Sequence, residues 1–325
     1  MFRAMIQKIG QVVLALSLVF GATAITGTGV HTAEAANPVR WQPGQLHIGS
    51  ISVGQGDATL IVSPEGKSML IDVNQSSASK IASYIQTVLG HKNLDYIVLT
   101  HYHADHMGDY VNLLKNYGVT VKSATYDRGG DRYAYNSTLY QTYYDYVTNT
   151  ANNAKRVQMR EGYYVNMGSV TVKCVSVGDP STNQASGILT KDENDRSIAL
   201  TVRYGNLDYF VAGDLSGQTT SQYTDIETAV APKVGSIEVY RVNHHGASYS
   251  SNQYFVDTLK PKQSIISVGY NTYGHPVSTV VSRLQAYGRV YQTETASGAV
   301  KDGNVILLST NGTNYTINGT SFVTK

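Results

Sequence analysis

The chain has 325 residues, enough for one large domain or two small ones, and its apolar share of 42% is ordinary for a globular protein. Charged residues make up only 15%, the formal net charge is +2, and no basic run predicts a nucleic-acid groove, which argues against a high-affinity DNA-binding protein. A nuclease is not excluded, because bound metal ions add positive charge that composition omits. The single cysteine, Cys174, excludes an intrachain disulfide, and its alternating apolar surroundings indicate a small core residue.

The N-terminus has the pattern of a secretory signal peptide. Arg3 and Lys8 form a positively charged start, and residues 12–22 are apolar. Small residues at the cleavage spacing follow at 33–35. The apolar run is too short for a membrane anchor, which needs roughly 20 residues. We therefore expect export from the cell, cleavage near Ala35-Ala36 and no transmembrane segment in the mature chain, and we exclude residues 1–36 from the fold.

A short linker is predicted over residues 37–45, and a single domain over residues 46–325. The domain begins with strand patterns and one helix pattern, and then reaches a short, nearly continuous apolar strand of the kind buried on both faces. In chain order these are strands 46–53, 58–62 and 68–73, helix 79–89, strand 94–100 and helix 105–116.

Strands and helices also alternate in the second half of the chain. Strands are predicted over 168–177, 197–204, 207–212, 237–242 and 263–268, helices over 216–230, 252–259 and 277–287, and a closing hairpin over 305–309 and 314–317. Two sheet-forming blocks with interspersed helices predict an α/β protein with an αβ/βα four-layer sandwich.

The residues after the apolar strand 94–100 carry the strongest chemical signal. His101, His103, Asp105 and His106 place three imidazoles and a carboxylate within six residues. At a strand end, residues two apart point the same way, so His101 and His103 can bind one ion. As the chain turns into a helix, Asp105 and His106 are directed to a second ion. Such a density of ligands has little structural use and predicts a metal centre.

The motif His-x-His-x-Asp-His at the end of an apolar strand resembles that of metallo-β-lactamase superfamily hydrolases. Three further stretches resemble the ComEC/Rec2-type competence-protein domain of that superfamily: Val53-Gly54-Gln55-Gly56-Asp57-Ala58, Asn243-His244-His245-Gly246 and Tyr273-Gly274-His275-Pro276. The phosphorylcholine esterase domain is a more distant match. The chain departs from the competence-type pattern at Ser52, Asn74, Asp109 and Ala247. None of these is a proposed metal ligand, so the departures bear on which substrate is hydrolysed and not on hydrolysis itself.

A centre of two metal ions takes about seven protein ligands. By the resemblance, Asp214 matches the carboxylate that bridges the two ions. His244, after strand 237–242, and His275, after strand 263–268, are the further candidates. The expected ligand set is His101, His103, Asp105, His106, Asp214, His244 and His275. No histidine lies between His106 and His244, so either His275 completes the set or one site is short of a ligand.

Three residues are expected to take part in catalysis: Asp105, His245 and His275. His245 is not expected to share an ion with the adjacent His244, because neighbouring side chains diverge, so it either contacts substrate, donates a proton or holds a ligand by a hydrogen bond. A proton-donating role is the alternative for His275.

Three more polar residues are expected to contact substrate or to hold a metal ligand in place: Asp57, Asn194 and Ser197. For Asp57 the alternative is a turn-stabilising role, and for Asn194 ordinary loop chemistry.

Tyrosines crowd the segment 126–164. Tyr140, Tyr143 and Tyr144 have helical i, i+3, i+4 spacing, which favours packing of an inserted helix. The alternative is an aromatic wall over the substrate.

Imidazole and carboxylate ligands without cysteine suit Zn²⁺, with Mn²⁺ possible, and two such ions lower the pKa of a shared water from 15.7 toward roughly 7. The expected function is a secreted two-metal hydrolase that cleaves phosphodiester bonds with an activated hydroxide, as a nuclease or phosphodiesterase with DNA as a candidate substrate. The alternatives are a small-substrate esterase of the phosphorylcholine-esterase or lactonase kind, and a metal-dependent binding module without activity.

Overall fold

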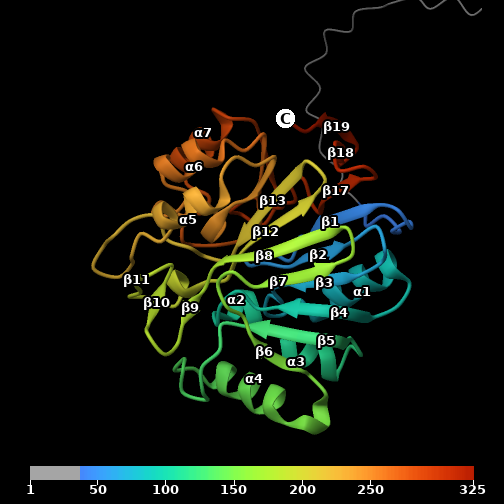
Figure 1. The fold of residues 1–325 in the computed structure, drawn as a ribbon, viewed down its shortest axis with the longest axis vertical. Coiled ribbons are helices and arrows are strands. Elements are labelled where there is room, and N and C mark those ends of the chain that lie inside the picture. The colour runs from blue at the N-terminus through green and yellow to red at the C-terminus, as the bar shows by residue number, and fades with distance from the viewer. Residues whose placement is uncertain (1–36) are drawn as a thin grey trace, which may run out of the picture. The chain divides into compact units, whose positions relative to one another are not determined.

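A computed structural model describes residues 37–325, and the expected signal peptide lies outside the described residues. A nine-stranded and a seven-stranded sheet share one apolar core, and each sheet packs helices on its other face (Figure 1). Of the helices in the described part of the chain, none is both long and apolar enough to cross a membrane.

The first sheet combines an antiparallel half with a parallel half. Its strand order is β19-β18-β17-β1-β2-β3-β4-β5-β6, and the pairs from β3 to β6 are parallel. Its strands are β1 (Leu46–Ser50), β2 (Thr59–Val62), β3 (Ser68–Ile71), β4 (Asn93–Val98), β5 (Thr120–Asp127), β6 (Arg156–Gln158), β17 (Val305–Ser309), β18 (Asn314–Ile317) and β19 (Thr320–Val323).

The second sheet has the same division. Its order is β16-β15-β14-β13-β12-β8-β7, and the pairs from β13 to β16 are parallel. Its strands are β7 (Tyr164–Met167), β8 (Val170–Ser176), β12 (Ala199–Tyr204), β13 (Leu207–Ala212), β14 (Val239–Arg241), β15 (Gln263–Ile266) and β16 (Arg289–Gln292), and a small separate sheet holds β9 (Gly178–Asp179), β10 (Gln184–Ala185) and β11 (Ile188–Leu189).

Helices cover the outer face of each sheet. The helices that follow strands of the first sheet are α1 (Ala78–Leu89), α2 (Ala104–Met107), α3 (Tyr110–Lys115) and α4 (Thr138–Thr148). Those that pack on the second sheet are α5 (Glu227–Val234), α6 (Gln253–Leu259) and α7 (Ser278–Gln285), and short 3₁₀ turns lie at Thr150–Asn152, Asn194–Arg196 and Asn243–Gly246.

The alternation of side chains along each strand explains the layers. In β2, Ile61 joins the core between the sheets, whereas Leu60 faces the helices. In β13, Tyr209 faces the first sheet, whereas Phe210 packs under α5 and α6. Both faces of these strands are buried, and the αβ/βα four-layer arrangement predicted from the sequence is confirmed.

Two helix predictions were wrong in extent. The helix predicted over 216–230 is confined to α5, because side chains in the preceding segment bind backbone amides instead: Thr220 Oγ1 accepts from Tyr223 N at 2.9 Å. The helix predicted over 105–116 is interrupted between α2 and α3, where the carboxylate of Asp109 accepts N–H bonds from Ser77 and Ala78 at the start of α1.

The tyrosine-rich segment forms α4, which packs on the first sheet. Tyr140 and Tyr143 are buried in the core beneath it, and Tyr143 donates a hydrogen bond to Asp127 at 2.7 Å. The packing interpretation is confirmed for these two rings. Cys174 is buried in the core between the sheets, as expected.

Candidate metal centre

The predicted metal-binding residues follow strands at one edge of the sandwich. The loop after β4 carries His101 and His103, and α2 carries Asp105 and His106. Asp214 follows β13, and His245 follows β14. Because the carboxyl ends of neighbouring parallel strands lie at the same edge, residues far apart in the sequence come together here.

The loop after β13 approaches the histidine loop closely. A Cβ atom on Gly213 would lie 2.4 Å from Thr100 Oγ1 and 2.9 Å from His101 Nδ1, so only glycine fits this position. Ser197 Oγ accepts a hydrogen bond from the backbone N–H of Asp214 at 3.0 Å. These contacts fix the carboxylate of Asp214 beside the histidines.

The two adjacent histidines after β14 lie in an unusual backbone conformation. His244 has φ 48° and His245 has φ 52°, both in the left-handed region that costs a non-glycine residue about 1–3 kcal/mol. This turn aims both rings at the same carboxylate: the Nε2 atoms of His244 and His245 lie 3.5 Å and 3.7 Å from Asp214 Oδ2. The side chains of His244 and His245 therefore do not diverge as predicted from their adjacency, because this turn brings both to Asp214.

Four residues form a compact set of possible metal ligands: Asp105, His106, Asp214 and His245. One donor atom from each lies within 4.8 Å of all the others. His106 Nε2 lies 3.2 Å from Asp214 Oδ1, and His245 Nε2 lies 3.3 Å from Asp105 Oδ2. The sequence assigned His244 to this set and gave His245 another role, whereas the structure places His245 in the set.

The remaining predicted ligands lie nearby but outside this compact set. His101 Nε2 is 3.0 Å from His103 Nδ1, and the His101 ring centre is 4.2 Å from that of His106. The His244 ring lies 5.7 Å from that of His275. The donors predicted for a second ion are therefore close to the first set without forming an equally compact one.

The charges of the four-residue set oppose the effect of burial. Burial alone would lower the pKa of His106, but the carboxylates of Asp214, Asp105 and Asp72 hold it well above its usual value. Burial would raise the pKa of Asp214, but the surrounding imidazoles, that of His106 foremost, hold it well below. In the metal-free chain a proton on His106 thus balances the carboxylates, and a metal ion that binds here has to displace it.

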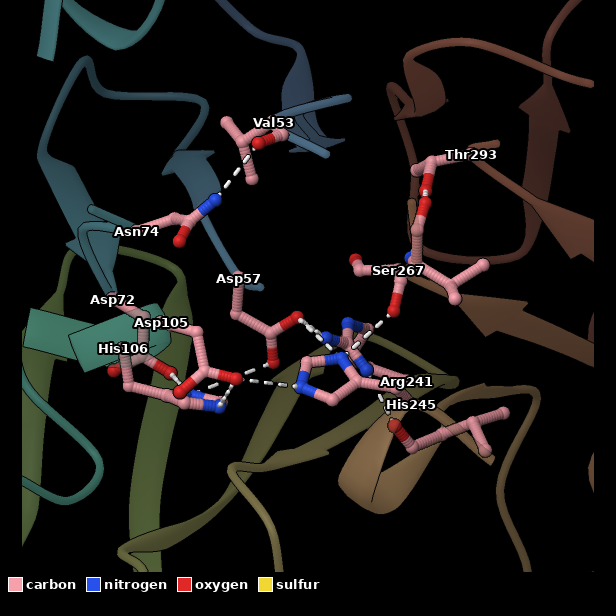
Figure 2. A network of polar contacts seen from close by, with 12 residues as sticks. Val53, Asp57, Asp72, Asn74, Asp105, His106, Arg241, His245, Ser267 and Thr293 are labelled. Atoms are coloured by element: carbon pink, nitrogen blue, oxygen red, sulfur yellow. Dashed lines mark hydrogen bonds and ion pairs between the residues drawn. The ribbon is translucent and has the colours of Figure 1, made fainter. Parts of the chain in front are cut away.

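Asp72 orients the His106 ring. It follows β3, next to the strand that carries the histidine motif, and its Oδ2 accepts a hydrogen bond from His106 Nδ1 at 2.8 Å (Figure 2). Thr100 donates two further bonds, at 2.7 Å from its backbone N–H and at 2.8 Å from its hydroxyl. Because Nδ1 is held in this way, Nε2 is left to face the other ligands. Asp72 was not among the residues predicted for the site, although an aspartate at the end of an apolar strand beside the motif strand was a usable signal.

A buried ion pair between Asp57 and Arg241 supports the other side of the centre (Figure 2). His245 Nδ1 donates to the backbone carbonyl of Ser267 at 2.9 Å, which directs Nε2 toward Asp105. Asp57 pairs with Arg241, a fully buried residue at the end of β14, and lies 3.7 Å from His245 Nδ1. The expectation that Asp57 supports a histidine fits this position, whereas Arg241 was not foreseen.

A second buried ion pair supports the histidine loop. Glu193 accepts hydrogen bonds from Arg128 at 2.7 and 2.6 Å, and also from the backbone N–H of Tyr102 at 3.0 Å. Tyr102 stands between His101 and His103, so this carboxylate fixes the backbone that presents both rings. Neither Glu193 nor Arg128 carried a recognisable sequence signal, because they meet only in the folded chain.

The donor set fits a divalent cation such as Zn²⁺. His106 Nε2, His245 Nε2 and Asp214 Oδ1 are buried and, within the described residues, none of them makes a hydrogen bond of good geometry, since their near neighbours are one another and Asp105, at 3.2 and 3.3 Å. A buried polar atom without a partner costs about 1–3 kcal/mol, so three such atoms facing one another favour a bound ion. Imidazole nitrogens and carboxylate oxygens are ligands that Zn²⁺ takes, commonly four at a time.

The centre lies in a cavity of about 660 Å³ that is open to solvent. Asn194 and His275, both predicted as site residues, line it, together with His103, His244, Asp105 and Asp214. Tyr223 and Tyr249 form one wall, with stacked rings 4.3 Å apart. Every residue lining this cavity lies within 37–325, and none of them is lysine or arginine.

Residues 51–146 match the family model described as the metallo-beta-lactamase superfamily. ComE operon protein 3 of Bacillus subtilis is 25% identical over 263 residues, covering 75% of this chain and 31% of that protein. Recombination protein 2 of Haemophilus influenzae is 27% identical over 264 residues, covering 78% of this chain and 28% of that protein. The chain thus spans less than a third of the length of either relative.

Among solved structures, the metallo-beta-lactamase fold protein YhfI from Bacillus subtilis superposes with a TM-score of 0.48 at 12% identity, covering 81% of this chain and 100% of that one. Unliganded yeast PDE1 gives 0.48 at 10% identity, covering 80% and 98%. Likeness at this distance supports no argument about function. The family match, the sandwich and the ligand set together indicate the class: residues 51–146 match the metallo-β-lactamase superfamily of metal-dependent hydrolases, and most of the chain is similar in sequence to the ComEC/Rec2 proteins.

Proposed function

We propose that this chain is a secreted phosphodiesterase that cleaves nucleic-acid strands outside the cell with two bound divalent ions. The observation that carries the proposal is the compact set of Asp105, His106, Asp214 and His245, with unpartnered donor atoms, beside an open cavity. The name of Recombination protein 2 refers to a process that acts on DNA, which supports a phosphodiester substrate. The signal-peptide pattern at residues 1–36 supports export.

When bound, a divalent ion polarises a phosphoryl oxygen and lowers the pKa of water toward 7. Asp105, His106, Asp214 and His245 would hold one ion. The second would take its ligands from His101, His103 and His244, with Asp214 shared, because His244 and His245 both face its Oδ2.

Two further residues can act on a proton at the cavity wall. Burial raises the pKa of Tyr249, so its hydroxyl, 3.4 Å from His244 Nε2, stays protonated and can donate a hydrogen bond to a substrate oxygen. Burial lowers the pKa of His275, so its ring is neutral at pH 7 and its buried, unpartnered Nδ1 can accept a proton or bind metal.

The test uses purified mature protein, its metal content, and hydrolysis of bis-p-nitrophenyl phosphate and single-stranded DNA with Zn²⁺, Mn²⁺ or Mg²⁺. We expect about two metal ions per chain and cleavage of both substrates. Asp214→Asn should lower kcat roughly a hundredfold or more. The matched control is Asp208→Asn at the other end of β13, where the carboxylate pairs with Arg203 on the surface. If DNA is not cleaved with any of the three ions, a nuclease is excluded.

A small-substrate hydrolase is the second candidate, and one observation favours it. Among residues 37–325, no lysine or arginine lines the cavity, so a long polyanion finds few partners beyond the metal centre. A phosphorylcholine ester or a lactone would need none. Faster turnover of either than of bis-p-nitrophenyl phosphate by the same preparation would favour this function.

A further inference from the structure

Two exposed tyrosines border the cavity on the loop between β15 and α7. Tyr270 is 69% exposed and Tyr273 is 73% exposed, and both line the cavity that holds the metal centre. Exposed aromatic rings gain little from folding, because most of their surface stays in water. Their position beside the candidate ligands therefore calls for another explanation.

The loop that carries these rings is well anchored. Asn271 Nδ2 donates to the carbonyls of Gly269 and His275, each at 2.9 Å, and its Oδ1 accepts from His275 N at 3.1 Å. Its own N–H donates to Ala296 O at 3.1 Å. The side chain of Asn271 thus fixes the conformation of the loop, so binding of a ligand to the two rings costs little conformational entropy of the loop backbone.

Tyr273 ends a series of neighbouring rings that begins at the centre, in which His275 meets His244 edge to face at 66°. Its ring lies nearly parallel to that of His275, at 25° and with the ring centres 5.7 Å apart. His275 is itself buried, and its ring centre lies 5.7 Å from that of His244, next to Asp214. The sequence of rings therefore leads from the metal ligands to an exposed aromatic surface at the rim.

The charge of the cavity limits what this surface binds. Since no lysine or arginine of the described part of the chain lines the cavity, phosphates that flank the scissile one find no basic side chain there. Additional affinity has to come from flat, uncharged groups. A nucleobase meets this requirement, because stacking on an aromatic side chain needs no charge and tolerates any base.

We propose that Tyr270 and Tyr273 form a stacking platform for the nucleobase next to the scissile phosphate, which makes an unpaired strand the substrate. This proposal rests on the proposed phosphodiesterase function and specifies its substrate. A base inside a duplex is already stacked on both faces, so the platform selects single strands or frayed ends.

The test compares ligands that share a phosphate and differ in the attached group. Thymidine 5′-monophosphate, deoxyribose 5-phosphate and phosphorylcholine are titrated calorimetrically into the zinc-loaded full mature chain. The wild type should bind the nucleotide about tenfold more tightly than the sugar phosphate, as expected for one stacked base. Tyr273→Ala should remove most of this difference and Tyr273→Phe should keep it. The control Tyr254→Ala removes a 52% exposed tyrosine on α6, which does not line the cavity, and should change nothing.

Equal affinity of the wild type for the nucleotide and the sugar phosphate would overturn the platform, as would a difference that persists when both tyrosines are alanine. Tighter binding of phosphorylcholine than of the nucleotide, lost in Tyr273→Ala, would overturn the base assignment in favour of a cationic head group. Hydrolysis of bis-p-nitrophenyl phosphate by the same preparation tests the proposed function separately. Activity on that diester without nucleotide selectivity refutes only the platform, whereas nucleotide selectivity without activity refutes only the phosphodiesterase.

Discussion

Replacing Asp72 by asparagine tests whether the metal centre depends on a residue outside the compact set of four ligands. Asn keeps the shape of Asp72, and its carbonyl can still accept the bond that Thr100 N donates at 2.7 Å. Its amide group cannot accept the bonds that His106 Nδ1 and the Thr100 hydroxyl donate to Oδ2, both at 2.8 Å, although the hydroxyl can turn and accept a bond from the amide instead. The loss of one charge-assisted hydrogen bond, about 1.5–3 kcal/mol, corresponds to roughly a 10- to 150-fold weaker binding of metal. We therefore expect the Kd for Zn²⁺ to rise about 10- to 100-fold.

The assay is competition for Zn²⁺ against a chromophoric chelator, with circular dichroism to confirm folding. Asp95→Asn is the matched control, because Asp95 is also buried and accepts bonds from the backbone and hydroxyl of one residue, Ser68, at 2.9 and 3.2 Å. Asp95 contacts the start of β3, whereas Asp72 follows the end of β3, beside the metal centre. We therefore expect Asp95→Asn to lower the stability of the protein without lowering its affinity for zinc. A folded Asp72→Asn protein with a Kd within twofold of wild type would refute the reasoning.

Three further outcomes follow from the buried charges. Arg241→Met leaves the buried carboxylate of Asp57 without its counter-charge and should lower the free energy of unfolding by about 3–5 kcal/mol. Adding Asp57→Asn should restore much of this loss. Urea titration of the wild type, the two single variants and the double variant checks this, and additive losses would contradict it. Burial raises the pKa of Glu227 to about 7. Between about pH 4.5 and pH 7 the folded chain therefore keeps a proton on Glu227 that the unfolded chain has released. As the pH rises through this window, the wild type should lose on the order of 3 kcal/mol of stability relative to Glu227→Gln. Parallel pH profiles of the free energy of unfolding for the two proteins would refute this. Removal of metal by a chelator should lower Tm, because an ion held by the folded ligand set and not by the unfolded chain stabilises the folded state, and addition of Zn²⁺ should restore it. An unchanged Tm in calorimetry would argue against a bound ion.

Much of the centre could be predicted from local sequence. His101, His103, Asp105 and His106 stand within six residues after an apolar strand, and Asp214 ends another, so strand-end position alone identified them. The layered fold could also be predicted, because strands that are buried on both faces appear in the sequence as continuous apolar segments. Helix extent was less predictable, since the polar segment before α5 binds its own backbone and residues of other loops.

The roles of His244 and His245 depended on a backbone conformation that local sequence does not specify. Two left-handed residues in succession bring both rings to Asp214, and nothing in the sequence Asn-His-His-Gly requires that turn. Side-chain direction follows from φ and ψ, and an argument from adjacency alone assumed extended backbone.

The sequence by itself determined which donor atoms are available and at which strand ends they lie, because strand burial and ligand chemistry are properties of short segments. Only the tertiary structure decided which histidine joins the compact set and which residues hold it, through Asp72, Arg241 and Glu193. Asp72 lies 34 residues from His106 and Glu193 lies 91 residues from Tyr102, while Arg241 is close to His245 in sequence but meets Asp57 from the other sheet. These pairs form because parallel strands from both sheets end at one edge. A buried charge finds its counter-charge in the packed core, where the geometry of two sheets, rather than the order of residues, sets the distances.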